Sequence, residues 1–435
     1  MIPKSSPTKR RLRAVSLFTG AGGLDYGFEA SSFETAVAIE FDPDCCATLR
    51  ASRPWPVIQK NIHTVSATEI CDTGGLARGS VDILIGGPPC QPFSKSGYWS
   101  KGDTLRLNDP RADTLSAYMR CLRDLQPTVF LLENVHGINY SGKEEGFLLL
   151  HRLTQAINKE LGCSYELSWK VLNAADFGVP QTRTRFFLIG HREGGRFRFP
   201  PPTHSCEVPS ASSPLSTEKT PTKPWVTAWD AIGHLTPERD EDLTVRGSWS
   251  ELLPSIPEGE NYLWHTNRKG GMPLFGWRTR YWSFLLKLAK DRPSWTIQAQ
   301  PGPAIGPFHW KNRLLSRQEL GALQTFPSTV KATGTRNAIQ RQLGNAVPSL
   351  LAEVLAREIR QQFFGTRRGA CTMEVPLNRP IPAPEAVVSV PPRYQQLAGS
   401  YPDHPGTGKG NKALEIRRSD SQSDTQVSLP FTESA

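Results

Sequence analysis

The chain has 435 residues, of which 38% are hydrophobic, a mean hydropathy of −0.40 and a formal net charge of +10. This length predicts two domains, or one large domain with an insertion, and the apolar content is enough for a soluble core. No apolar run reaches the roughly 20 residues that cross a bilayer, which excludes a membrane protein, and the positive charge favours a polyanionic partner without proving one.

The N-terminus, "MIPKSSPTKRRLR", is basic and is followed by no apolar segment, so it is not a secretory signal. We predict a basic tail over residues 1–12, either solvated or in contact with nucleic acid. The eight cysteines are scattered and include no C-x-x-C pair, which argues against a zinc site and a disulfide framework. We expect no bound metal and a reducing, cytoplasmic compartment.

Residues 14–190 alternate apolar, β-rich runs with helical patterns, which predicts an α/β fold with a doubly wound sheet. Helices are expected near residues 111–125 and 144–161. Ligands in such sheets bind at the carboxyl ends of the strands. The runs predicted to be buried parallel strands are "AVSLF" (14–18), "TAVAIEF" (35–41), "VDILIGG" (81–87), "TVFLLENV" (128–135) and "RFFLIGH" (185–191).

The composition changes after about residue 195, where a segment rich in Pro, Ser and Thr cannot continue the sheet. Residues 225–310 combine many tryptophans with interleaved basic residues and weak periodicity, so we expect a smaller, irregular domain. Its tryptophans are expected in the core more often than at a ligand. Helical spacing returns at 349–364, and the proline-rich, polar chain from 366 to 435 is predicted to be mostly disordered.

The first candidate site is the glycine-rich turn "LFTGAGGLDYGFE" (17–29), which follows a strand and precedes a helix. Gly20 and Gly22 fit G-x-G, but Asp25 holds the place of the third glycine in the dinucleotide fingerprint. Such a turn alone is as typical of a plain strand–helix connection. Glu40, at the end of the second strand, can bond a ribose hydroxyl, and Phe41 can face an adenine ring. Together these residues predict an adenosine-containing cofactor.

The second candidate is "GGPPCQPFS" (86–94), where Cys90 follows two prolines at the end of a buried strand. The prolines restrict the backbone, so the thiol is held in one direction, as a nucleophile requires. The alternative is a buried, inert cysteine, which fits a proline-framed strand end poorly. The polar run that follows is suited to a loop that closes over substrate.

Two further motifs carry charge at strand ends. Glu133 and Asn134 end an apolar strand in "FLLENVHG", where burial raises the pKa of a carboxyl group, and a protonated Glu can donate to a ring nitrogen. A helix cap or a structural salt bridge is the alternative. Arg183 and Arg185 alternate along "PQTRTRFF" and so face one way, to bind a pyrimidine carbonyl or a phosphate, or simply to lie exposed on an edge strand.

Taken in this order, the motifs resemble those of the C5-cytosine-specific DNA methyltransferases of bacterial restriction–modification type, over nearly all of residues 14–360. "FTGAGG" is similar to the family's cofactor turn, "PPCQPFS" to its nucleophile loop, "ENV" to its acidic motif and "QTRTR" to its arginine motif. "WDAIGHL" (229–235) and "RLLSRQELGALQTFP" (313–327) are similar to segments that enter and organise the recognition domain. "QLGNAVP" (342–348) is similar to the family's final motif, which returns to the cofactor pocket.

The resemblance implies a Rossmann-like S-adenosylmethionine-dependent domain, with a smaller target-recognition domain inserted before the last helix. It places the catalytic domain at 13–195 and 335–365 and the recognition domain with its hinge at 196–334. It implies transfer of a methyl group to C5 of a flipped-out cytosine in a specific duplex DNA sequence, through a covalent bond between Cys90 and C6.

The resemblance also assigns site residues by number. The catalytic residues are Cys90, Glu133, Arg183 and Arg185, with Arg183 orienting either Glu133 or a backbone phosphate. The cofactor residues are Phe18, Gly20, Gly22, Gly23, Leu24, Glu40, Phe41, Asn61, Ile62, Pro89, Asn345 and Val347. The DNA-binding residues are Gln91, Ser94, Arg268, Arg278 and Arg280.

Two positions depart from the family pattern. Asn61-Ile62 stands where the family often has Asp-Ile, so an amide oxygen would meet the adenine amino group. Between "DPR" (109–111) and Leu115 the spacing is one residue longer than usual, which leaves a cofactor contact of Leu115 open.

Three other functions compete with this interpretation. A tRNA cytosine-5 methyltransferase of the same fold shares every catalytic residue, but the Trp-rich insertion favours duplex DNA. A non-catalytic DNA-binding relative predicts loss of Cys90 or Glu133, and both are present. A nicotinamide dehydrogenase leaves those residues without roles. We expect a monomer acting on double-stranded DNA in the cytoplasm, associated with the nucleoid, with a cognate restriction endonuclease as a further partner.

Overall fold

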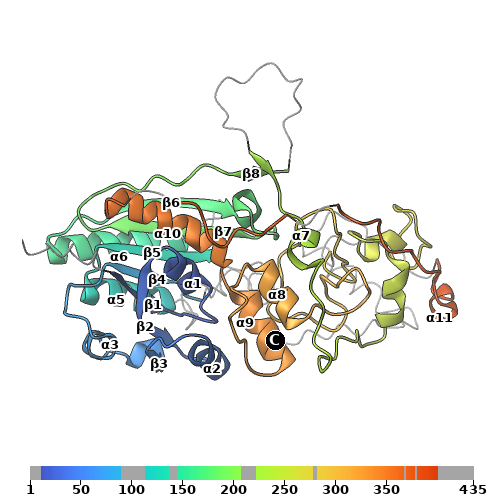
Figure 1. The fold of residues 1–435 in the computed structure, drawn as a ribbon, viewed down its shortest axis with the longest axis horizontal. Helices are drawn as coiled ribbons and strands as arrows, with labels where there is room; N and C mark the ends of the chain where they lie inside the picture. Colours follow the sequence, from blue (N-terminus) through green and yellow to red (C-terminus); the bar gives the residue numbers. More distant parts are fainter. Residues whose placement is uncertain are drawn as a thin grey trace, which may run out of the picture.

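The computed structural model describes residues 11–89, 113–136, 145–206, 222–277, 282–366, 369–377 and 380–399. Its centre is a seven-stranded sheet with the order β3-β2-β1-β4-β5-β7-β6 (Figure 1). The strands are β1 (Leu12–Leu17), β2 (Phe33–Glu40), β3 (Val57–Gln59), β4 (Ile83–Gly86), β5 (Val129–Val135), β6 (Glu166–Asn173) and β7 (Thr184–His191).

Strands β1 to β5 pair in parallel, as predicted, but the prediction of a parallel strand at 185–191 is wrong. β7 runs antiparallel to both β5 and β6. The reason is the connection: only residues 174–183 join β6 to β7, and a parallel crossover needs about a dozen residues or more. β7 therefore runs back alongside β6 and lies between β6 and β5 in the sheet.

Helices cover both faces of this sheet, as a doubly wound fold requires. On one face α3 (Ala67–Gly74), α5 (Asp113–Leu125) and α6 (Glu145–Leu161) contribute to one apolar core. On the other face α1 (Gly23–Ala30) and α10 (Ser349–Phe363) contribute to a second. The helices expected near 111–125, 144–161 and 349–364 are confirmed. α2 (Pro43–Ser52) follows β2, with Asp42 capping its first turn.

Helices α1 and α10 pack so closely that their interface accommodates only a glycine at Gly27. A Cβ there would lie 2.5 Å from the backbone nitrogen of Glu353 and from the Cβ of Ala352. Because α1 begins at the glycine turn and α10 comes from much later in the chain, this contact brings α10 behind the predicted cofactor turn.

A second region, the Trp-rich region (described residues 222–277 and 282–334), lies beside the sheet in Figure 1. Its regular elements are short: α7 (Ala228–Ile232), the 3₁₀ helices η6 (Ser250–Ser255) and η7 (Tyr262–His265), and α8 (Arg317–Leu323). Two small apolar cores pack it: the first also contains Ala21 and Tyr26 and so joins the region to the glycine turn and α1, and the second lies within the region apart from Tyr394. Trp310 is buried in the first, whereas Trp282 is 47% exposed.

Short elements connect these parts. α9 (Arg336–Asn345) precedes α10, β8 (His204–Ser205) pairs with β9 (Lys223–Pro224), and η1 (Ile62–Thr64), η5 (Ala174–Phe177) and α11 (Pro392–Gln395) complete the described chain. Within the described residues, every helix is too short or too polar to cross a lipid bilayer.

Residues 369–377 and 380–399, here called the C-terminal strap, fall in the segment for which disorder was expected. In the structure they lie against both parts of the molecule, and Tyr394 is buried in the second core of the Trp-rich region. The composition of the segment did not reveal this, because its few apolar residues are spaced along an extended chain without helical or strand periodicity.

Candidate active site

The main described catalytic and cofactor candidates come from one edge of the sheet, where β1, β2, β4 and β5 end. Leu17 pairs with Gly86, and Gly86 pairs with Leu132, so the chain leaves these three strands side by side. Three of the predicted motifs come directly after these positions in the chain. The glycine turn follows Leu17, the segment that leads to Cys90 follows Gly86, and Glu133 follows Leu132. A parallel sheet thus places together motifs that are far apart in sequence.

The glycine turn is held by a carboxylate rather than by its own hydrogen bonds alone. Phe18, Gly20 and Gly22 have φ of 52°, 57° and 87°, a left-handed backbone that favours glycine at the latter two. Glu40 accepts a hydrogen bond from the Gly20 amide at 2.6 Å. It also accepts from the amides of Phe41 and Asp42, each at 2.8 Å. Glu40 therefore fixes two strand-end loops at once.

The last family-like motif returns to this turn, as the sequence predicted. A Cβ on Gly23 would lie 2.3 Å from the carbonyl oxygen of Val347, so the two segments are in direct backbone contact. Asn345 is exposed beside them, and the ring of Phe41 is 69% exposed. Leu24 is buried and packs into the core beneath.

Asn61 and Ile62, which the resemblance assigns to the cofactor, both make contacts within the protein. The Asn61 side-chain oxygen accepts a hydrogen bond from the His63 amide at 3.1 Å and caps η1. Ile62 is buried in the core between the sheet and α5, and its carbonyl accepts from Arg120 at 2.7 Å. Leu115 is likewise buried in that core.

The glycine turn rests on a fully buried carboxyl group, that of Asp25. It accepts hydrogen bonds from Ser16 at 3.0 Å and Thr35 at 3.3 Å, and Thr19 of the turn donates to Ser16 at 3.0 Å. Burial raises the pKa of Asp25 to about 7, against hydrogen bonds that lower it and a repulsion from Glu29 that adds to the rise. The sequence showed Asp25 only as a missing glycine.

This raised pKa makes stability fall as pH rises. Between the ordinary carboxyl pKa and about 7, the unfolded chain has lost the proton that the folded chain keeps, so the free energy of unfolding decreases with pH. We expect Asp25→Asn to remove roughly 2.5 kcal/mol of this decrease between pH 5 and pH 8, measured by urea unfolding at each pH. Asp72→Asn, at an exposed position of α3, is the matched control. Parallel pH curves for wild type and Asp25→Asn would refute the assignment.

Glu133 and Arg185 form a buried ion pair at the end of β5. The Arg185 Nε and Glu133 Oε1 atoms are 3.0 Å apart, and the side chains are only 15% and 11% exposed. Burial raises the pKa of Glu133, and the positive charges of Arg185 and Arg183 oppose this rise. A Cβ on Gly87 would lie 2.8 Å from Glu133 Oε2, so this glycine lets the carboxylate approach the strand end before Cys90.

Arg183 is buried, so of the two roles expected for it, a contact with a backbone phosphate is excluded and the orientation of Glu133 stays a prediction. It is 1% exposed, and it donates to the Gly344 carbonyl at 2.7 Å and the Ile297 carbonyl at 3.4 Å. A guanidinium in this position has no surface for a phosphate. It instead connects the start of β7 to the end of α9 and to the Trp-rich region, behind Glu133.

The chain before Cys90 is held on both sides. The Asn134 amide donates to the Pro88 carbonyl at 3.2 Å, and the Thr114 hydroxyl donates to the carbonyl of the exposed Pro89 at 3.0 Å. Sequence reasoning did not single out Thr114 or Gly87; the doubled glycine of "IGGPP" was the available signal for the latter. Cys90, Gln91, Ser94, Arg278 and Arg280 lie outside the described residues.

Of the predicted DNA-contacting residues, Arg268 is described. Its guanidinium lies 4.1 Å from the ring centroid of Trp277, in a cation–π contact. Both residues belong to the Trp-rich region and come from the basic, aromatic run in its centre.

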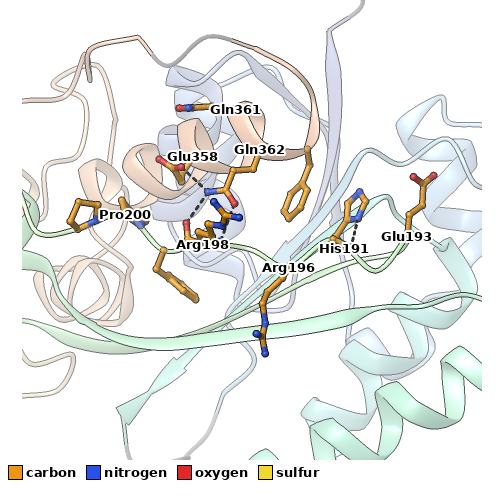
Figure 2. Close-up of a pocket in the computed structure, with 12 residues that line it drawn as sticks. His191, Glu193, Arg196, Arg198, Pro200, Glu358, Gln361 and Gln362 are labelled. Carbon is orange, nitrogen blue, oxygen red and sulfur yellow. Dashed lines mark hydrogen bonds between the residues drawn. The ribbon is translucent and has the colours of Figure 1, made fainter.

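A pocket of about 700 Å³ lies away from this edge, between the end of β7 and the end of α10 (Figure 2). Because β7 is antiparallel, its last residue His191 pairs with Val129 at the start of β5, so the pocket is at the opposite end of the sheet from Glu133. Gln362 bonds the backbone of Arg198 there, and the His191 ring stacks on Phe363. The pocket is therefore not part of the site.

Comparison with known proteins agrees with this arrangement. A family model described as C-5 cytosine-specific DNA methylase matches residues 12–361. The Type II methyltransferase M.SacI of Streptomyces achromogenes is 39% identical over 375 residues, covering 81% of this chain and 93% of that protein. The Type II methyltransferase M1.HphI of Haemophilus parahaemolyticus is 32% identical, covering 80% and 86%.

Solved structures show the same fold. Entamoeba histolytica methyltransferase EhMeth superposes with a TM-score of 0.53 at 16% identity, covering 81% of this chain and 99% of that one. Since the family model spans most of the chain and the curated relatives are covered nearly end to end, the chain belongs to the C-5 cytosine-specific DNA methylase family and is a DNA cytosine-5 methyltransferase.

Proposed function

We propose that this enzyme transfers a methyl group from S-adenosylmethionine to C5 of a cytosine flipped out of duplex DNA, with Cys90 as the nucleophile. The observation that carries the proposal is the buried Glu133–Arg185 pair, which lies against Gly87 at the strand end leading to Cys90. A carboxyl group and a guanidinium side by side match the ring nitrogen and carbonyl edge of a cytosine.

The chemistry follows from the weak nucleophilicity of cytosine C5. Addition of the Cys90 thiolate to C6 breaks the ring's aromaticity and makes C5 enamine-like. Glu133 hydrogen-bonds N3 and the exocyclic amine, and its raised pKa favours the protonated form that donates to N3. Arg185 holds O2. After C5 is methylated, a base removes the C5 proton, the C6–sulfur bond breaks and the Cys90 thiolate leaves.

The glycine turn and its neighbours fit an adenosine-containing cofactor. A carboxylate has about four lone-pair positions, and Glu40 uses three on backbone amides, which leaves one for a ribose hydroxyl. The exposed Phe41 ring offers a face to adenine, and the space beyond Gly20 is open. The Asn61 oxygen keeps its second lone pair for an amino group. When bound, S-adenosylmethionine supplies the electrophilic methyl group.

The substrate is proposed to be double-stranded DNA, read by the Trp-rich region. Extruding a base costs a few kcal/mol, and the contacts of that region with the duplex would offset it. Arg268, stacked on Trp277, is the described candidate for a contact with a base edge. A monomeric, nucleoid-associated enzyme with a partner endonuclease stays a prediction.

Covalent trapping tests this function. The purified protein, given labelled S-adenosylmethionine, should methylate duplex DNA and not tRNA, and bisulfite sequencing of DNA from expressing cells should give the target site. A duplex with 5-fluorocytosine at that site should then form an irreversible adduct with the protein, because fluorine cannot leave as a cation. Methylation of tRNA alone, or efficient DNA methylation without any adduct, would contradict the proposal.

A further inference from the structure

The C-terminal strap lies beyond residues 12–361, the part of the chain that matches the family model. Figure 1 shows it in red, running from the end of α10 past α7 to α11 at the far side of the Trp-rich region. It is therefore an element of this chain whose role neither the catalytic motifs nor the family explains.

The first anchor of the strap is Glu353, a fully buried residue of α10. Its carboxylate accepts hydrogen bonds from the Thr372 amide and hydroxyl at 2.7 and 2.9 Å and from the Met373 amide at 2.9 Å. Arg357 neutralises it at 2.6 Å. Since α10 packs on α1 across Gly27, this anchor ties the strap to the helix that begins at the cofactor turn.

The second anchor is a buried charge cluster in the Trp-rich region. Lys290 is 4% exposed and contacts Glu258 at 2.7 Å, and the strap adds Glu385 at 3.1 Å and the Ala383 carbonyl at 3.0 Å. Lys287, buried nearby, donates to the Ile256 carbonyl, and both glutamates oppose the lowering of its pKa to about 8 by burial. The buried Lys290 ammonium thus meets its second carboxylate only when the strap is docked.

The positive and negative charges of this buried cluster are balanced only when the strap is docked. Burying two like charges with one opposite charge is unfavourable, so Lys287 and Lys290 with Glu258 alone would leave one buried positive charge unbalanced. The Glu385 amide also donates to Glu258 at 2.7 Å, which orients the carboxylate that Lys290 binds.

The third anchor is aromatic. Tyr394 is buried, and its hydroxyl donates to the Ser248 carbonyl at 2.7 Å. Its ring stacks on Trp249 with centroids 5.6 Å apart and planes at 18°. The Val388 amide donates to the Pro254 carbonyl at 3.1 Å, so the strap follows the surface of η6 before reaching this core.

We infer that the C-terminal strap is a positioning element that holds the Trp-rich region at the orientation in which it engages DNA, without contributing to methyl transfer itself. This rests on the proposed function, in which the Trp-rich region reads the duplex. The strap shares the task with direct contacts between the two parts, such as the Thr182 amide to the Ser294 carbonyl at 2.8 Å. Its loss should therefore weaken DNA binding without abolishing activity.

Substitutions in the full-length enzyme separate this role from simple stabilisation. Glu385→Gln removes the strap's charge from the lysine cluster, and Tyr394→Ala removes the stacked ring. Val387→Ala, at a position that is 50% exposed on the same strap, is the matched control. Tyr394→Phe keeps the stacked ring and should therefore retain most of the wild-type affinity for the duplex. For each we measure KM for a duplex that the wild type methylates, kcat at saturating duplex, the Kd for S-adenosylmethionine and Tm.

We expect Glu385→Gln and Tyr394→Ala to raise KM for the duplex about tenfold, a typical coupling between separate parts of a protein. kcat at saturating duplex should stay within about twofold, which is the signature of lost binding energy rather than lost catalysis. An unchanged KM with a lowered Tm would overturn the inference, and so would a weaker Kd for S-adenosylmethionine. A failure of the proposed function would instead appear in the wild type, as absent methylation or trapping.

Discussion

Cys90→Ser should reduce methyl transfer to duplex DNA by more than about 10⁴-fold, the scale seen when an enzyme loses its nucleophile. A serine hydroxyl has almost the same size as the thiol, but it is far harder to ionise and adds poorly to C6. The chain leading to this residue is fixed by Asn134 at the Pro88 carbonyl and by Thr114 at the Pro89 carbonyl. The measurement is single-turnover transfer of a labelled methyl group, with binding to the duplex followed by a mobility shift.

The duplex affinity of Cys90→Ser should remain close to that of the wild type, because the substitution removes chemistry and not contact area. The 5-fluorocytosine adduct should be absent. Cys206→Ser, at an exposed cysteine far along the chain, is the control and should retain full activity. If Cys90→Ser kept normal methylation, another group would have to be the nucleophile and the mechanism would be wrong.

The sequence predicted the sheet and its site because the key motifs sit directly after apolar strands. A strand's hydrophobic run fixes where it ends, and a parallel sheet brings those ends together. For this reason the amino-acid pattern alone was enough to place Gly20, Glu40 and Glu133 at one edge. The contact of Gly23 with Val347 was expected only from the resemblance of "QLGNAVP" to the family's final motif.

Other features depend on connections and long-range contacts that no local pattern reveals. The direction of β7 is decided by the short link from β6, and β6 itself alternates too weakly to stand out, with Trp169 exposed. The role of Arg183 depends on carbonyl groups at Gly344 and Ile297, more than 100 residues away. The strap escaped prediction because the partner of Glu385 is Lys290, a lysine buried in a different region.

Glu133→Gln should lower kcat by about 10²–10³-fold, the loss expected when one preorganised donor to a developing charge is removed. Glutamine has nearly the same shape as glutamate, but its amide cannot protonate N3. It also carries no charge to balance the buried Arg185, whose Nε lies 3.0 Å from Glu133 Oε1 in the wild type. KM for the duplex should change little, since the contacts of the Trp-rich region with DNA are untouched. Single-turnover kinetics at saturating duplex and cofactor give the value directly.

The matched control is Glu166→Gln, an exposed glutamate at the start of β6 with a loose contact to Arg196 at 3.7 Å, which should leave kcat within about twofold. Glu133→Gln is also expected to unfold at a lower temperature, because burial of Arg185 is then uncompensated. The two effects are separable: a lowered Tm with an unchanged kcat would make Glu133 a structural ion-pair partner. A lowered kcat in enzyme that remains folded at the assay temperature would make it the group that stabilises charge on the cytosine ring.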